Sequence, residues 1–483
     1  MSNPDLPPEP PTFATERHPH LRLIIPAIVA VAFLIEQLDA TVIVTALPAM
    51  AVSLGTTPIH LNLAITAYIL ALAMFIPLSG WLADRFGSRR IFALSLFVFA
   101  LGSTLCGLAS SFEMLIATRA LQGLGGAMMT PVGRLILIRS FPRRRLATAM
   151  AYVTYPAIVG PLIGPLVGGF FTTYISWRWI FFINVPFALA GMVAALRYVD
   201  DVEGDPSAVF DFRGFLLVGI GFTLLQLGLE NIGRGTVPPA VVAAVLIAAA
   251  LLLVTFAVYA RNAKAPAVDL TLFRDRAFRI ATLFGGICRI GFNGLPFLLP
   301  LLLQLGFGLT PIVSGALTCV SALAAAPVRA ISVAALRRWG FRISMTASAV
   351  AGSVMLASFA LLEPTTPKWI IVVLTFAFGL TRATQFMSSN TLAYAEIPAA
   401  RLSRATSLGA MLQQLTVSFG VSIAAILLAS VAPEGARLTP ENFHAVFLMS
   451  AIIPLLAVPG FFLLRPQDGD EVTGRNPPPA PPA

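Results

Sequence analysis

The sequence predicts an all-α integral membrane protein in which fourteen helices cross the bilayer. Of its 483 residues, 57% are hydrophobic and 11% are charged, whereas a soluble protein carries about 25% charged residues. Long apolar runs recur along the whole chain, and a helix needs about 20 apolar residues to cross a hydrocarbon core of ~30 Å. No water-soluble fold could bury so much apolar surface, so lipid must be the solvent for most of the chain.

The apolar runs give the predicted spans in chain order. They lie at 21–48, 61–82, 91–109, 112–138, 147–173, 177–198, 212–231, 238–260, 278–304, 312–335, 342–361, 368–394, 406–430 and 443–464. The connections between them are short. The first 20 residues and the segment 467–483 are polar and rich in proline, so we expect two disordered tails.

The basic residues predict the orientation of the spans. If the N-terminus is cytoplasmic and the spans alternate, 23 of the 32 Lys and Arg residues fall on the inside, four fall outside and five lie within spans. Such a bias is the positive-inside pattern of membrane proteins, and it predicts that both termini are cytoplasmic. The net charge of +10 therefore reflects orientation. It does not indicate nucleic-acid binding, because the basic residues do not form one patch.

A weak internal repeat indicates two halves. The stretch RFGSR (Arg85 to Arg89) follows the second span, and RWGFR (Arg338 to Arg342) follows the tenth. Such short matches also arise by chance, but repeated halves are common in transporters. They divide the chain into a six-helix bundle at 21–198, two additional helices within 199–265 and a second six-helix bundle at 266–466.

The loop GWLADRFGSRR joins the second and third spans on the inside. Its glycines allow a tight turn and close helix approach, and its acidic residue can join the neighbouring arginines in a charge network that opens and closes. A plain positive-inside loop would explain the arginines but not the acid or the glycines. The candidate gating residues are Gly80, Asp84, Arg85, Gly87, Arg89 and Arg90.

This loop resembles the hallmark loop of the major facilitator superfamily, and further stretches resemble its fourteen-span drug:proton antiporters. They are LDATVIVTALP from Leu38, RALQGLGGAMMTP from Arg119, GPLIGPLVGG from Gly160, WRWIFFINVP from Trp177, FDFRG from Phe210 and VDLTLFRDRAFR from Val268. The resemblance implies the major facilitator fold, with two six-helix bundles around a central cavity and two inserted helices. It also implies a proton-coupled antiporter that exports hydrophobic or amphipathic small molecules from the plasma (inner) membrane, as in multidrug efflux and antibiotic resistance.

Two positions depart from the family pattern. Val44 stands where members of this subfamily often have Asn, and Arg337 stands where the repeat would place a counterpart of Asp84. A second gating network in the C-terminal half must therefore be built differently.

The fifth span carries a stripe of small residues and prolines. Small residues let membrane helices approach closely, and proline bends a helix, so an ordinary kinked packing helix would explain the pattern. The resemblance to antiporters implies in addition a seal between the two halves, and both can hold. The residues are Gly160, Pro161, Gly164, Pro165, Gly168 and Gly169.

Charges inside the spans are the sharpest functional signal, because each costs about 2.5–3.5 kcal/mol at the bilayer centre. Glu36 and Asp39 share one face of the first span, and Arg119 lies at a depth similar to that of Asp39, ~10–13 Å from the outer surface at about 1.5 Å per residue. We expect Asp39 and Arg119 to pair in at least one state, although the pair could be purely structural. Glu36, Asp39 and Arg119 are the candidate proton-coupling residues. Arg134 and Arg329 are expected to extend toward the cytoplasm.

Other chemistry is disfavoured. There is no phosphate-binding loop, no histidine ligand spacing and no GxSxG elbow, so we expect no enzyme activity, no metal and no cofactor, with the proton as coupling ion. We expect a monomer whose partners are lipid and amphipathic substrates. A nutrient importer or symporter and a membrane-embedded enzyme or sensor remain alternatives. The residues proposed to line a substrate cavity are Phe33, Gln37, Phe292, Asn293, Gln304, Phe376 and Gln385.

Overall fold

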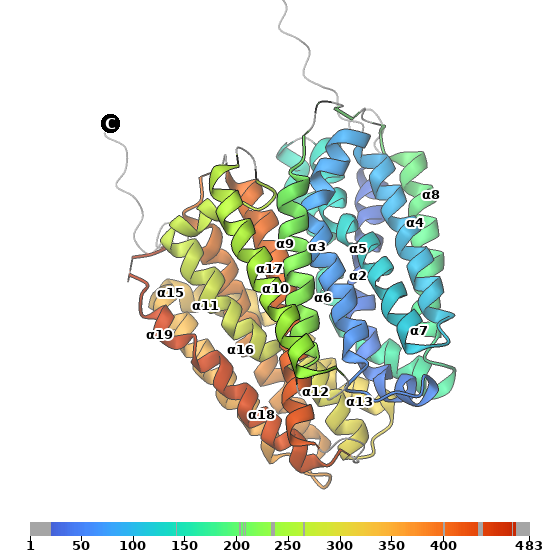
Figure 1. Ribbon diagram of the computed structural model, residues 1–483, viewed down its shortest axis with the longest axis vertical. Coiled ribbons are helices and arrows are strands. Elements are labelled where there is room, and N and C mark those ends of the chain that lie inside the picture. Colours follow the sequence, from blue (N-terminus) through green and yellow to red (C-terminus); the bar gives the residue numbers. More distant parts are fainter. Residues whose placement is uncertain are drawn as a thin grey trace, which may run out of the picture.

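The computed structural model is a bundle of long helices (Figure 1). It describes residues 21–141, 143–201, 204–205, 207, 209–232, 237–263, 266–398, 401–432, 438–465 and 467–469, without the side chains of 143–148, 150–158, 329 and 403. The predicted tail at 1–20, most of the tail at 467–483 and the side chain of Arg329 lie outside these described parts.

The predicted fold class is confirmed. Within the described residues, 13 helices are long and apolar enough to cross a membrane. A further helix of 32 residues, α6 (Arg143–Tyr174), begins in the segment whose side chains are not described, and it occupies the predicted fifth span. The predicted spans at 212–231 and 312–335 both form helices.

Six spans form the N-terminal half. The sixth span is broken at Ile183 into a single turn and a longer helix. The helices are α2 (Leu21–Ser53), α3 (Asn62–Phe86), α4 (Ser88–Gly107), α5 (Phe112–Ser140), α6, and α7 (Trp179–Phe182) with α8 (Asn184–Tyr198).

The C-terminal half repeats this order with more interrupted helices. Gly294 and a π-helical turn divide its first span, and its second span consists of three successive pieces. The elements are η1 (Leu270–Arg274), α11 (Arg276–Asn293), α12 (Leu295–Leu301), η2 (Leu302–Gly306), α13 (Pro311–Thr318), α14 (Val320–Leu323), α15 (Ala325–Ser358), η3 (Phe359–Leu361), α16 (Lys368–Ala395), α17 (Leu402–Val431), α18 (Pro440–Leu455) and α19 (Val458–Phe461).

The internal repeat has a structural counterpart. Gly87, between α3 and α4, has φ 90°, and Gly340, inside the continuous stretch α15, has φ 73° with a non-helical ψ. Positive φ is a conformation that glycine adopts at little cost. RFGSR and RWGFR therefore make the same sharp turn at the same place in each half, and α15 contains the end of one span and the whole of the next.

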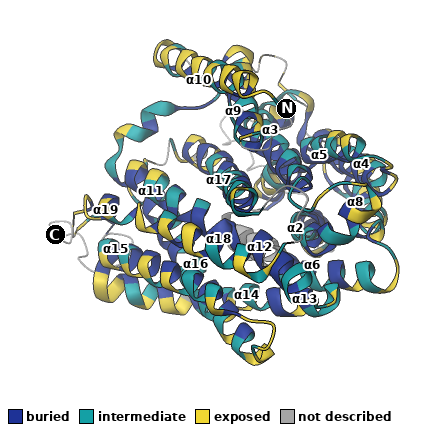
Figure 2. Cartoon of the chain, turned by 60° about the horizontal axis from the view of Figure 1, so that its bottom comes forward, coloured by how far each residue is buried: buried dark blue, intermediate teal, exposed yellow. Residues whose placement is uncertain are grey.

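The two inserted helices are α9 (Phe212–Glu230) and α10 (Pro239–Asn262). α9 lies against α3 and α17, and α10 lies outside it at the edge of the molecule, where Figure 2 shows much of its surface exposed. In the most apolar stretch of α10, only 17% of the residues are buried, against 83% in the span Arg276–Gly306. α10 therefore presents most of its surface to the surroundings, which suits contact with lipid.

We call the end of the bundle at which α2 begins the terminal face, and the opposite end, where α2 ends and α3 begins, the distal face. Several contacts between the halves lie toward the distal face. Gln304 donates to the Thr45 carbonyl at 3.1 Å, and the Ile312 amide donates to Thr173 at 3.2 Å. A Cβ on Gly169 would lie 2.5 Å from the Pro311 carbonyl oxygen, so the backbones of α6 and α13 approach closely there.

Candidate functional site

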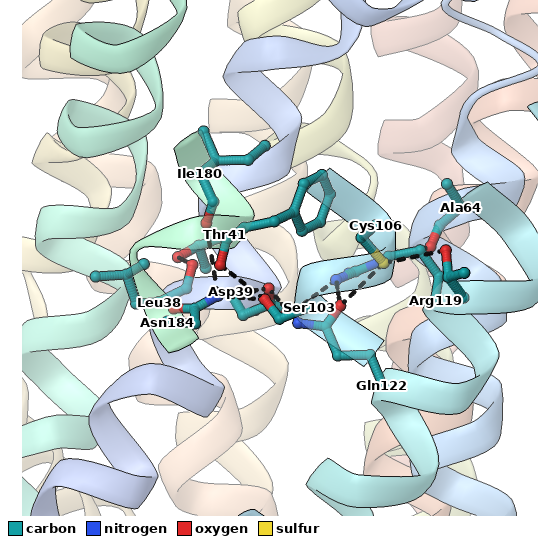
Figure 3. A network of polar contacts seen from close by, with 12 residues as sticks. Leu38, Asp39, Thr41, Ala64, Ser103, Cys106, Arg119, Gln122, Ile180 and Asn184 are labelled. Carbon is teal, nitrogen blue, oxygen red and sulfur yellow. Dashed lines mark hydrogen bonds and ion pairs between the residues drawn. The ribbon is translucent and has the colours of Figure 1, made fainter. Parts of the chain in front are cut away.

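A buried polar network surrounds Asp39 in α2 (Figure 3). Its carboxylate accepts hydrogen bonds from Arg119 Nη1 at 2.6 Å, Gln122 Nε2 at 2.9 Å and Asn184 Nδ2 at 3.0 Å. The side chains of Asp39 and Arg119 are both 0% exposed. The contact expected from their matching depths is therefore present, and two side-chain amides complete the coordination of the carboxylate.

Arg119 is held from several directions. Its Nε donates to the Ala64 carbonyl of α3 at 3.1 Å, its Nη1 also donates to Gln122 at 2.7 Å, and its guanidinium carbon lies 4.2 Å from the centroid of the Tyr68 ring. A buried charge of this kind is tolerated only when it is paired and hydrogen-bonded. The network thus ties α2, α3, α5 and α8 together.

Glu36 has a different environment, one turn nearer the terminal face on the same side of α2. It is 6% exposed, and Oε2 accepts a hydrogen bond from Thr130 of α5 at 2.6 Å. Arg134 lies within electrostatic range, and its guanidinium carbon is 5.9 Å from the Phe33 ring centroid. Glu36 therefore has fewer hydrogen-bond donors around it than Asp39.

The hallmark loop does form a charge network, but its pairs differ from the predicted ones. Asp84 pairs with Arg139, at the end of α5, at 2.9 Å. Arg89 and Arg90 pair with Asp201, beyond the end of α8, at 2.6 and 3.2 Å. The expectation that Asp84 contacts the loop's own Arg89 and Arg90 is corrected, because the turn at Gly87 directs these arginines toward the end of α8.

The glycines of this loop also have separate roles. Gly87 makes the turn described above, and Gly80 lies within α3, where a Cβ would meet nothing within 4 Å. The prediction that Gly80 allows close helix approach is therefore wrong. In the adjoining connection, the Asp205 amide donates to the Asp84 carbonyl at 2.7 Å, and a Cβ on Gly204 would lie 2.0 Å from the Arg85 carbonyl oxygen. The link to α9 thus covers the hallmark loop.

At the Gly340 turn, the contacts of the arginines among the described residues are with aromatic rings. The guanidinium carbon of Arg338 lies 5.8 Å from the centroid of the Trp339 ring, and that of Arg342 lies 5.0 Å from the Phe462 ring. Cation–π contacts of this kind hold a cation without a carboxylate. These contacts hold the arginines at the Gly340 turn, where Arg337 stands in the position that Asp84 has in the first half.

The small-residue stripe of α6 faces two neighbours. A Cβ on Gly164 would lie 2.1 Å from Thr41 Oγ1, and one on Gly168 would lie 2.3 Å from Thr45 Oγ1. A Cβ on Gly160 would likewise clash with Gln37 of α2, whereas one on Gly169 would clash with α13 of the other half. The glycines therefore allow close packing within one half and, at the distal end, between the halves. Pro165 belongs to the second contact, because its carbonyl oxygen lies 2.1 Å from where a Cβ on Gly315 would stand; Pro161 lies in the same helix, α6.

The residues proposed for a cavity are dispersed. Phe292 is buried against Phe378, and Gln385 accepts a hydrogen bond from Ser348 inside the C-terminal half. Phe376 is 36% exposed. These three side chains meet at no common site in the described structure, and their role in lining a cavity stays a prediction. Helices that are apolar on all sides do not reveal which face points inward.

The other four proposed residues take part in separate contacts. Phe33 lies beneath Arg134, Gln37 packs against Gly160, and Gln304 joins the halves at Thr45. Asn293 accepts a hydrogen bond from Arg382 at 3.0 Å. These residues share no single site in the described structure.

Sequence reasoning missed a further buried carboxylate, on an inserted helix. Glu230, at the end of α9, is 0% exposed. It accepts hydrogen bonds from Asn62 of α3 at 3.0 and 3.2 Å, from Gln226 at 3.2 Å and from Ser422 of α17. An acidic residue within an apolar run was the available signal. Glu230 links both halves to the inserted helix α9 near the distal face.

The motif FDFRG positions α9 and α10. Asp211 caps α9 by accepting from the Gly214 amide at 2.9 Å, and such caps satisfy backbone donors at a helix start. The same carboxylate accepts from the Tyr259 hydroxyl at 2.7 Å and from the Ala267 amide at 3.0 Å. One side chain thus joins the start of α9 to the end of α10.

The motif VDLTLFRDRAFR anchors the next connection. Asp269 pairs with Arg401 at 3.3 Å and Arg404 at 3.6 Å, near the start of α17. Burial acts to raise the pKa of Asp269, but hydrogen bonds from Thr271 and the ion pair with Arg401 outweigh it and hold this pKa below its usual value. The carboxylate therefore stays ionised at neutral pH and fixes the terminal face of the C-terminal half.

Comparisons with known proteins agree with this architecture. The family model described as the Major Facilitator Superfamily matches residues 29–421. A protein of Escherichia coli provisionally named multidrug resistance protein MdtD is 36% identical over 441 residues, covering 91% of this chain and 93% of its own length. A protein of the same name from Pectobacterium atrosepticum is 36% identical over 440 residues, covering 91% and 94%.

Solved transporter structures share the fold. A peptide transporter in complex with sulfate has a TM-score of 0.69 at 16% identity and covers 92% of this chain and 95% of its own. A bacterial homologue of the human lysosomal transporter Spinster, inward-facing and unoccupied, has a TM-score of 0.64 at 14% identity and covers 92% and 96%. The helical architecture, the family model and the relatives lead to one conclusion: the chain belongs to the major facilitator superfamily, whose matched members are transporters and not enzymes.

Proposed function

We propose that this protein exports hydrophobic or amphipathic small molecules in exchange for protons. The observation that carries the proposal is the pair of buried carboxylates on α2, Asp39 and Glu36, with one tied to Arg119 and the other held by Thr130. Buried ionisable groups in transmembrane helices mark ion pathways in many carriers. The name multidrug resistance protein, carried by relatives at 36% identity, supports the substrate class.

The two carboxylates have separable tasks in this proposal. Asp39 fixes the helices around it, because each of its oxygens already accepts a hydrogen bond and a guanidinium balances its charge. Glu36 carries the proton, because it has fewer donors and can exchange its Thr130 contact without dismantling the network. Arg119 balances the charge of Asp39 through the ion pair at 2.6 Å, and the pair opens only if the helices rearrange.

The conformational cycle uses the two faces alternately. Contacts between the halves toward the distal face, at Thr45–Gln304 and Thr173–Ile312, favour a state closed on that side. Substrate then enters from the terminal face, which the charge bias predicts to be cytoplasmic. Separation of the distal contacts would admit a proton from outside and release the substrate.

The proposal places the protein in the inner membrane as a monomer with the proton as its coupling ion. The test is uptake of labelled amphipathic compounds into inside-out vesicles with an imposed proton gradient. We expect uptake that collapses with a protonophore while ATP remains plentiful. Uptake that persists after the gradient is lost would contradict proton coupling.

A further inference from the structure

The C-terminal half carries one arginine on each of the helices that correspond to α2 and α5. Arg289 of α11 is 8% exposed, and its Nη2 donates to Asn390. Arg382 of α16 is partly buried, and its Nη2 donates to Asn293 at 3.0 Å. Among the described residues, neither forms an ion pair with a carboxylate.

One aromatic ring joins the two cations. The guanidinium carbon of Arg289 lies 4.9 Å from the centroid of the Phe386 ring, and that of Arg382 lies 5.1 Å from it. Contact with a ring offsets part of the cost of burying a cation. It does not supply the oxygen acceptors that guanidinium N–H groups require.

Several hydrogen-bond donors here have no acceptor. Within the described structure, Arg289 Nε, Arg382 Nε and Asn293 Nδ2 are buried without a hydrogen-bond partner. Leaving such donors unsatisfied is costly, most of all on a charged group. Three unsatisfied donors at neighbouring side chains indicate a site shaped for acceptor oxygens that the described part of the chain does not provide.

A small cavity adjoins Arg289. It has a volume of about 30 Å³ and lies between α11, α16 and α17, with Ser389, Asn390 and Gln413 in its wall. Gln413 Nε2 donates to Asn390 Oδ1 at 3.0 Å, so this amide oxygen already serves Arg289 and Gln413. Among the residues that the structure describes, Ser389 Oγ has no hydrogen-bond partner either. The wall therefore offers further donors beside the guanidinium.

The two halves differ in the sign of their buried charge. The first and fourth helices of the N-terminal half carry Glu36 and the balanced pair Asp39–Arg119, whereas α11 and α16 carry two cations. A guanidinium binds a carboxylate through paired, charge-assisted hydrogen bonds. The acids needed for proton exchange and the cations suited to binding an anion thus lie on opposite halves.

We propose that Arg289 and Arg382, joined by Phe386, form the subsite that binds the carboxylate of an amphipathic organic anion. The proposal deepens the export function and rests on it for the direction of transport. The carboxylate occupies the acceptor positions opposite the unpartnered Nε atoms, and the apolar part of the substrate extends along the helices that line the path between the halves.

Equilibrium binding to the purified full-length protein in nanodiscs tests the subsite. The probes are naphthoate, naphthamide and naphthylmethylammonium, which share a ring system and differ in charge. We expect naphthoate to bind about tenfold more tightly than the neutral or cationic probe, as one charge-assisted hydrogen bond supplies. Arg289→Gln and Arg382→Gln should each remove this preference and leave naphthamide binding unchanged, while Arg289→Lys and Arg382→Lys should keep part of it.

The control is Arg261→Gln, which removes an exposed arginine at the end of α10. It should leave all three affinities unchanged. Equal binding of the three probes, no binding of naphthoate, or an anion preference that survives in both Gln variants would overturn the subsite. A variant that misfolds would lose naphthamide binding too, and the Lys variants then decide the outcome.

Transport of the same probes separates this inference from the proposed function. If a proton gradient drives naphthamide transport but wild-type protein shows no anion preference, the exporter stands and the subsite fails. If naphthoate binds with the predicted preference but no probe moves in response to the gradient, the subsite stands and proton-driven export fails.

Discussion

Two carboxylates one turn apart on α2 experience very different surroundings. Asp39 is 0% exposed and has an ionic partner at 2.6 Å, whereas Glu36 has a hydroxyl donor from Thr130 at the same distance. Matching depth in the sequence was enough to predict the Asp39–Arg119 contact. The amides of Gln122 and Asn184 that complete it could not be predicted, because their orientation depends on how four helices pack.

Asp39→Asn should destabilise the protein. The substitution leaves Arg119 buried without its counter-charge, and removing one partner of a buried pair costs about 3–5 kcal/mol. Thermal unfolding in detergent should show a lower Tm. Adding Arg119→Gln removes the uncompensated charge and should recover much of the loss. An unchanged Tm for Asp39→Asn alone would show that this pair does not anchor the fold.

Glu36→Gln should stop proton-driven export and spare substrate binding. The amide keeps the size of the side chain and can still accept from Thr130, but it cannot exchange a proton. Export in vesicles should fall to background and lose its pH dependence, with Tm near that of the wild type. Thr130→Val serves as the matched control, since it removes the hydrogen bond and keeps the acid. Normal coupled export by Glu36→Gln would return the coupling role to Asp39.

At the scale of elements, motifs recognised along the chain prove to connect distant helices. The sequence predicted the hallmark loop, the repeat and the glycine stripe, because these depend on local backbone geometry and spacing. It paired Asp84 with neighbouring arginines, yet the partner is Arg139, 55 residues along the chain. Likewise, Glu230 gains its partners only when α9 is placed against α3 and α17, and span counting cannot supply that placement.

Asp84→Asn should slow transport without unfolding the protein. Asp84 and Arg139 are 55% and 32% exposed, and an exposed ion pair contributes less than about 1 kcal/mol. Turnover in vesicles with matched protein levels should decrease, and Arg139→Gln should reproduce the effect. If either variant turned over at the wild-type rate, the Asp84–Arg139 pair would have no gating role.

Glu230→Gln should loosen the inserted helix. The carboxylate accepts hydrogen bonds from Asn62, Gln226 and Ser422. The amide of Gln would place an N–H donor against these donors, and the lost hydrogen bonds would cost about 1–3 kcal/mol of stability. We expect a lower Tm and faster proteolysis of the connection after α9. Glu363→Gln, at an exposed acid near the same face, is the control. Equal stability of the two variants would rule out a structural role for Glu230.

At the scale of the whole molecule, lipid makes much of the architecture readable from the sequence. Span length follows from bilayer thickness, so the order of the spans could be predicted. Charge bias predicts their orientation. The dispersal of Phe292, Phe376 and Gln385 could not be predicted, because an apolar helix surrounded by helices or lipid gives no sign of its inward face.

Both termini should be cytoplasmic. The charge bias predicts this, and an even number of spans returns the chain to its starting side. A reporter active only in the periplasm, fused after residue 483, should give no signal, whereas the same reporter inserted in the connection between α2 and α3 should be active. Activity at the C-terminus would mean that the orientation or the span count is wrong.

The position of α9 also determines where molecules dissolved in the membrane can reach the interior. α9 follows the line where α3 meets α17: Val218, Gly219 and Phe222 lie against that line near its middle, and Glu230 closes it near the distal face. This flank of the protein is therefore shielded from the acyl chains. A lipophilic compound that arrives sideways through the bilayer would instead approach on the opposite flank, between α6 and the span that begins with α13. The two flanks of the carrier therefore present different surfaces to the lipid.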